Sequence, residues 1–136
     1  MAYFLAKQEP SSYSIHELAR EGETVWDGVT NAQAVNVIKT MRPGDIMLIY
    51  HSGDEKAIVG AAEVISEPRP DPDLPKSWVV DVRYRGTFDR PVTLKEVKAS
   101  GRWDDFLLVR HSRLSTMPAP DEFIDWLRQE YGAAIP

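Results

Sequence analysis

The sequence predicts a single α+β domain, a small mixed β-barrel of five or six strands flanked by short helices. Three observations support this fold class. The 136 residues suffice for one domain with its own core. Short apolar or alternating runs are separated by turns rich in the 8 glycines and 10 prolines. Finally, the strands do not alternate regularly with long helices, which argues against a doubly wound parallel sheet and favours a small mixed barrel.

The N-terminal segment predicts a strand followed by a short helix. The apolar run at 3–7, YFLAK, reads as a first strand and is ended by the turn residues QEPSS. Ser14 and Glu17 have the spacing of a capping box, so we expect a helix to begin at Ser14. This helix should end near Gly22.

A second short strand and a second helix are expected next. Residues 24–26, TVW, form another extended piece, and Asn31 is a favourable N-cap for the helix that follows. The turn sequence RPGD at 42–45 ends this helix. Three apolar residues recur at helical spacing and define its buried face: Ala34, Ile38 and Met41.

The centre of the chain carries the strongest strand signals. Residues 46–51 are apolar throughout, as expected for a strand buried on both faces, and 57–67 follow a polar turn as the second arm of a hairpin. The proline-rich stretch 67–76 is expected to be a loop that cannot join a ladder. Residues 78–86 alternate between apolar and charged side chains, which predicts a half-buried strand.

The C-terminal third is expected to be mainly helical. Residues 93–96, TLKE, form a second capping box and begin a short helix. The stretch 103–110, WDDFLLVR, is compatible with either helix or strand. A last helix should begin near Pro120 and end at Gly132.

Composition limits the function classes. The chain has no cysteine, which removes disulfides, thiolate catalysis and zinc sites built on sulfur. No signal peptide and no apolar run of membrane-spanning length is present, so we expect a cytoplasmic protein without a membrane partner. The formal net charge is −5. Any nucleic-acid binding must therefore depend on local chemistry, because the global field is unfavourable.

Signals for catalysis are weak. The three histidines show no HxH or HExxH spacing, and no GxSxG, Walker or GxGxxG motif occurs. Ser52 and Ser112 each follow a histidine directly, but neighbouring side chains in a strand point to opposite faces. We therefore expect no catalytic residues, no metal site and no cofactor.

Signals for binding are stronger, beginning with the stretch WDGVTNAQAVN at 26–36. Trp26 offers a flat apolar face on which a base could stack. Gly28 would let the backbone approach a ligand closely. Carboxamides supply both donors and acceptors for the edge of a nucleobase, and three follow closely: Asn31, Gln33 and Asn36. The alternative interpretation is that Trp26 belongs to the core and Asn31 only caps a helix.

Two further polar clusters accompany this stretch. A buried strand ends in Tyr50, His51 and Ser52, which presents hydroxyl and imidazole groups at a rim. In RHSRLS at 110–115, Arg113 is a natural contact for an anion. The alternatives are a histidine and tyrosine hydrogen-bonded near the sheet edge, and a solvated arginine.

With these clusters in view, the chain resembles the EVE-domain family of PUA-like proteins. Matching stretches occur in order along almost the whole chain: AKQEPSSYS (6–14), WDGVTNAQAVN (26–36), PGDIMLIYHS (43–52), AIVGAAEV (57–64), PVTLKEVK (91–98) and SRLSTMP (112–118). The family usually shows Lys-Ser-Glu-Pro and WDGVRNxQARN in the first two stretches. Here Gln8 replaces the serine, and Thr30 and Val35 replace arginines.

The resemblance implies a PUA-type barrel that holds a modified nucleobase, either a modified cytosine in DNA or a modified base in RNA. Trp26 would form a wall or stack, Asn31 and Gln33 would read polar edges, and Tyr50 to Ser52 would line the floor. The full ligand-binding set implied in this way is Lys7, Glu9, Trp26, Asp27, Gly28, Val29, Asn31, Gln33, Asn36, Tyr50, His51, Ser52, Ser112, Arg113, Leu114 and Ser115.

The missing arginines and the acidic charge favour a single-stranded or flipped nucleotide over duplex DNA, because fewer phosphate contacts are available. We expect the protein to bind as a monomer and to act as a non-catalytic reader of the modified base. Two other classes remain open. One is a nucleotide-processing hydrolase that uses His51 with Glu9 or Asp27 as acid and base. The other is a small-molecule sensor or protein-interaction module.

Overall fold

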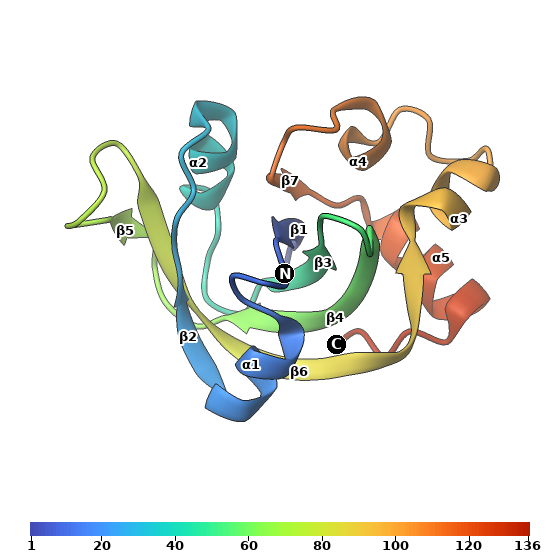
Figure 1. The fold of residues 1–136 in the computed structure, drawn as a ribbon, viewed down its shortest axis with the longest axis horizontal. Helices are drawn as coiled ribbons and strands as arrows, with labels where there is room; N and C mark the ends of the chain where they lie inside the picture. The colour runs from blue at the N-terminus through green and yellow to red at the C-terminus, as the bar shows by residue number, and fades with distance from the viewer.

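The computed structural model describes residues 1–136, and its strands form one curved, open, roughly barrel-like sheet with short helices around it (Figure 1). The elements are β1 Tyr3–Gln8, α1 Ile15–Glu21, β2 Glu23–Trp26, α2 Ala32–Ile38, β3 Ile46–His51, β4 Ala57–Val64, β5 Arg69–Pro70, β6 Trp78–Thr93, α3 Leu94–Ala99, α4 Leu107–Arg110, β7 Thr116–Pro118 and α5 Asp121–Tyr131. The predicted α+β class and its PUA-like barrel are confirmed.

The order of strands across the sheet is β2-β6-β4-β3-β1-β7, and β5 pairs with β6. The pair β1–β3 is parallel, and the other pairs are antiparallel. Strands β2 and β7 therefore end the path, and α2 contacts both β7 and β6. This helix thus packs against the β7 end of the sheet and against β6, the neighbour of β2. Helices α3, α4 and α5 gather near the C-terminal end of β6 (Figure 1).

Helix positions follow the capping signals. Ser14 and Glu17 form the predicted capping box of α1, and Thr93 and Glu96 form that of α3. Asn31 caps α2, whose Ala34 and Ile38 are completely buried. The helix ends at Ile38, earlier than the predicted stop at 42–45, and Met41 is buried just beyond its end. Gly132 ends α5 in the left-handed conformation. The ambiguous stretch 103–110 contains the short helix α4. None of the helices combines the length and apolar character that crossing a membrane requires.

Three strand predictions need correction. Residues 69–70 join the ladder as β5, because Pro70 lies at the sheet edge, where its missing N–H is tolerated. Strand β6 continues past residue 86 to Thr93, and Pro91 falls where no residue of β4 is in register with it. The three residues of β7 gave no periodic signal. These additions raise the number of strands from the expected five or six to seven.

The sheet leaves no room for a side chain at Gly60, where β4 pairs with β6. A Cβ atom there would lie 2.5 Å from the carbonyl oxygen of Gly86 and 2.9 Å from Cδ1 of Ile15. We expect Gly60→Ala to lower the free energy of unfolding by about 1–3 kcal/mol, because the nearest obstacle is backbone. Urea denaturation measures this. Gly132→Ala is the comparison, because its Cβ would meet nothing within 4 Å and only the left-handed backbone disfavours it. Equal stability of wild type and Gly60→Ala would contradict the packing argument.

Candidate functional site

The register of three strands brings distant segments to one edge of the sheet. In the parallel pair, Lys7 of β1 lies opposite Tyr50 of β3, so both strands end at the same edge. The N–H of Ser52 donates to the carbonyl of Gln8 over 2.9 Å. Strand β7 runs the other way and begins at this edge, where the N–H of Lys7 donates to the carbonyl of Ser115 over 2.7 Å.

A fourth segment, between β2 and α2, closes the site. Gly28 has a φ of 77°, a left-handed conformation that glycine adopts without strain. The hydroxyl of Ser77 donates to the carbonyl of Val29 over 2.5 Å and fixes the segment to the start of β6. Asn31 then begins α2, because its Oδ1 accepts from the N–H of Ala34 over 3.0 Å.

These four segments border an open hollow of about 410 Å³, which we call the central cavity. Its wall consists of Lys7, Gln8, Glu9, Trp26, Asp27, Gly28, Val29, Thr30, Asn31, Ser52, Ser112, Arg113 and Ser115. Eleven of the 16 predicted site residues are among them. The structure therefore brings together most of a set that is spread over more than 100 positions in the sequence.

A second hollow of about 390 Å³, the side cavity, adjoins the first. The two share four wall residues: Gln8, Trp26, Asp27 and Gly28. Tyr13 lines the side cavity, and its hydroxyl is hydrogen-bonded to the carboxylate of Glu21. Burial, together with this bond, raises the pKa of Tyr13 to about 12. Its hydroxyl is therefore a neutral group in this wall at physiological pH.

Five predicted residues lie outside the central cavity, and their placement corrects the predicted floor and edge. Leu114 is fully buried in the core, and Tyr50 is 3% exposed. Gln33 and Asn36 are exposed on α2, since the helix turns Ala34, Val35 and Ile38 toward the core instead. His51 is the fifth.

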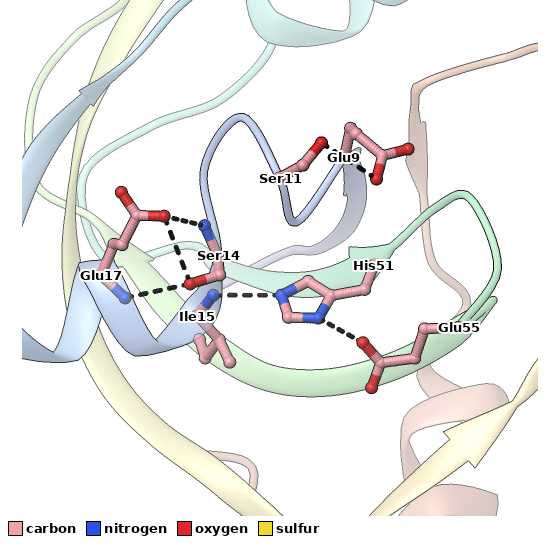
Figure 2. A network of polar contacts seen from close by, with 7 residues as sticks. All are labelled: Glu9, Ser11, Ser14, Ile15, Glu17, His51 and Glu55. Carbon is pink, nitrogen blue, oxygen red and sulfur yellow. Dashed lines mark hydrogen bonds and ion pairs between the residues drawn. The ribbon is translucent and has the colours of Figure 1, made fainter.

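His51 holds α1 against β3 and is not free for chemistry (Figure 2). Its Nε2 accepts from the N–H of Ile15 over 3.0 Å, so this nitrogen carries no proton. Its Nδ1 therefore donates to the carboxylate of Glu55 over 2.7 Å. Glu9 is hydrogen-bonded to Ser11 in the same view. The structure does not assemble the acid–base pair of His51 with Glu9 or Asp27.

Trp26 is a wall residue with little open surface. It is 3% exposed and belongs to the hydrophobic core cluster. Of the two predicted roles, the geometry fits the wall, because a stacking platform would need an open ring face. Its burial agrees with the alternative that places Trp26 in the core, and the residue also borders both cavities.

Lys7 places a positive charge in the cavity wall. Its ammonium donates to the carbonyl of Ser112 over 3.0 Å and lies 5.5 Å from the centre of the Tyr50 ring. Burial lowers the pKa of Lys7 and raises that of Tyr50. Glu9, Asp27 and Arg113 also line the cavity, and none of the three forms an ion pair. The wall therefore holds two cations and two carboxylates.

Several hydrogen-bonding groups of the wall have no partner within the protein. The amide NH₂ of Asn31 is free, because only its Oδ1 is used for capping. The hydroxyls of Ser52, Ser112 and Ser115 make no hydrogen bond to the protein. A cavity bordered by a tryptophan, free polar groups and two charges of each sign is suited to holding a small polar heterocycle.

The EVE domain family model matches residues 2–130. The chain belongs to the EVE-domain family. Among curated proteins, thymocyte nuclear protein 1 of rat is 29% identical over 161 residues, covering 92% of this chain and 71% of the relative. The human protein of the same name is 28% identical over 162 residues, covering 93% and 72%.

Solved structures agree with this family. The protein Rpa0253 of Rhodopseudomonas palustris, solved by NMR, has a TM-score of 0.91 and 37% identity, covering 100% of this chain and 97% of the neighbour. The human THYN1 protein, solved in complex with 5-methylcytosine-containing DNA, has a TM-score of 0.88 and 25% identity, covering 99% and 100%. An ASCH protein of Zymomonas mobilis, at 9% identity and a TM-score of 0.56, shares the fold alone.

Two wall residues were missed as site residues, Gln8 and Thr30. At both positions the family usually has another residue, serine at 8 and arginine at 30. A position inside a family motif is a candidate for the site even where its residue differs, and this signal identifies Gln8 and Thr30. Gln8 lines both cavities. Val35, the third departure, is buried in the core and lines neither cavity.

Proposed function

We propose that this EVE domain is a non-catalytic reader that binds a modified cytosine base in the central cavity. The observation that carries the proposal is the convergence of four distant segments on one hollow with unused hydrogen-bonding groups. The likeness to human THYN1, whose structure contains 5-methylcytosine DNA, supports the choice of base.

Asn31 would act as a hydrogen-bond donor to the base. Its carbonyl oxygen accepts the capping bond of α2, so the part of the amide left for a ligand is the NH₂ group, which can only donate. Cytosine offers two acceptors, O2 and N3, for such a donor. The seryl hydroxyls can donate or accept around the rest of the ring. Lys7 and Arg113 would contact the phosphates that flank the base. Trp26 and Val29, the two apolar residues of the wall, would lie beside the ring.

The base would reach the cavity only out of the helical stack, from a single strand or by flipping. Extruding a paired base costs a few kcal/mol, whereas an unpaired base enters without that cost. The acidic net charge of −5 gives no long-range attraction to repay it. We therefore propose that the reader favours single-stranded DNA. RNA with a modified cytosine is the second target to test. We also propose that the protein binds as a monomer.

Substitution of Asn31 tests the reader role without removing the helix cap. Asn31→Asp retains an oxygen for the N–H of Ala34, because Asp and Asn are equivalent N-caps, but replaces the donor by an acceptor. We expect about tenfold weaker binding of 5-methyldeoxycytidine, since a lost hydrogen bond to a buried base costs about 1–1.5 kcal/mol. Calorimetric or NMR titration measures the affinity, and thermal unfolding checks that α2 is intact.

Asn36→Asp is the matched control, because Asn36 is an exposed amide of the same helix that lines neither cavity. Asn31→Ser, which also keeps the cap, separates loss of the donor from added negative charge. Equal affinity of wild type and both Asn31 variants would contradict the donor role. Equal affinity for methylated and unmodified cytosine would contradict the reader itself.

A further inference from the structure

The ion pairs of this protein use arginine alone, which leaves every lysine without a carboxylate partner. Six arginines pair with Asp or Glu, and none of the six lysines does. Surface pairs of this kind neutralise most of the arginine charge. The lysines are thus the main uncommitted positive charges on a chain whose net charge is negative.

Half of these lysines line one groove. A hollow of about 500 Å³, the lysine groove, is bounded by Asp54, Glu55, Lys56, Thr93, Leu94, Lys95 and Lys98. Lys95 and Lys98 are three residues apart on α3 and so project from one side of the helix. The groove also holds two carboxylates, Asp54 and Glu55, and the bond from the neutral His51 leaves the charge of Glu55 in place. Three ammonium groups therefore face two carboxylates, and the positive charge exceeds the negative by one.

The β3–β4 turn connects the lysine groove to the central cavity. Ser52, at the start of this turn, lines the central cavity, and Asp54 to Lys56, at its end, line the groove. The N–H of Leu94 donates to the carbonyl of Lys56 over 2.8 Å and holds the turn against α3. The two hollows therefore lie on either side of a single short turn.

Lys56 itself occupies a position that glycine would fill with less strain. Its φ is 48°, in the left-handed region, which costs a non-glycine residue roughly 1 kcal/mol. The side chain is exposed and makes no hydrogen bond or ion pair that would offset this cost. The ammonium group of Lys56 is therefore available to an external anion.

We propose that the lysine groove binds the phosphodiester backbone of the strand whose base occupies the central cavity. This inference rests on the proposed reader function and adds the path of the nucleic-acid strand. The nucleic acid would leave the central cavity at Ser52 and pass over the β3–β4 turn to α3. Lys56, Lys95 and Lys98 would each neutralise a phosphate. The cavity would supply the base selectivity, and the groove would supply affinity that is independent of sequence.

The salt dependence of oligonucleotide binding tests this path. The triple variant Lys56→Gln, Lys95→Gln, Lys98→Gln is titrated by fluorescence anisotropy with a single strand of about 12 nucleotides that contains one 5-methylcytosine. Each phosphate contact to a single strand contributes about 0.7 to the slope of log K against log salt, so the slope should become shallower by about 2. Binding of the free nucleoside 5-methyldeoxycytidine should be unchanged.

The control triple variant is Arg20→Gln, Lys39→Gln, Lys76→Gln, which removes the same charge at residues that line neither the central cavity nor the groove. Lys76 also shares the left-handed backbone of Lys56, and its loop between β5 and β6 lies across the molecule from α3 (Figure 1). An equal slope change in both triple variants would overturn the groove, as would no change in the first. If wild type binds neither methylated nucleoside nor oligonucleotide, the reader function fails instead.

Discussion

Ser115→Trp should abolish binding of the modified base while leaving the fold intact. Ser115 lies in the wall of the central cavity, and the indole would occupy space that the base requires. We expect affinity for 5-methyldeoxycytidine to fall at least about 100-fold, which corresponds to about 2.7 kcal/mol of binding free energy. Titration calorimetry measures the loss, and circular dichroism with thermal unfolding shows whether the variant is folded.

Ser100→Trp is the matched control, since Ser100 is a half-buried serine that lines neither cavity. The smaller replacement Ser115→Leu gives a second measurement if the tryptophan variant does not fold, and it should weaken binding to an intermediate degree. Full affinity in a folded Ser115→Trp or Ser115→Leu protein would move the binding site away from the central cavity.

His51→Ala should produce the largest loss of stability, about 3 kcal/mol in the free energy of unfolding. Removal of the ring leaves the buried N–H of Ile15 without its acceptor, which by itself costs about 1–3 kcal/mol. The space left by the deleted ring, which is 2% exposed in the native residue, adds a further cost. Urea denaturation followed by circular dichroism gives the value.

The exposed His16 provides the comparison, and His16→Ala should change stability by less than about 0.5 kcal/mol. Where the His51→Ala protein is still folded, we expect it to bind the modified base with nearly native affinity, because His51 does not line the central cavity. A stable variant that has lost binding would instead place His51 in the site.

Predictions from local sequence were most accurate where the interacting residues are neighbours in the chain. The capping boxes at Ser14–Glu17 and Thr93–Glu96 form as expected, because both partners lie within one turn of the same helix. The burial of β3 on both faces is also a local property, visible in its uninterrupted apolar run. In contrast, β5 and β7 are too short to show a period, and their existence depends on pairing with β6 and β1.

The candidate site divides in the same way. The resemblance to the EVE family implied 11 of the 13 residues that line the central cavity. A family motif preserves positions that lie close together in the fold, even when they are far apart in the sequence. It did not separate wall residues from those that serve the core. Gln33 and Asn36 share the amide chemistry of Asn31 but face solvent, and His51 caps α1 rather than lining the floor.

The sequence by itself determined the fold class, the family, most helix ends and the segments that build the site. Tertiary structure alone decided which side chain of each segment reaches the cavity, because this depends on strand register and helix rotation set by distant packing. The parallel pairing of β1 with β3 aligns Gln8 with His51 and so brings Ser52 to the cavity edge. No local pattern encodes such a pairing, since its partners are more than 40 residues apart.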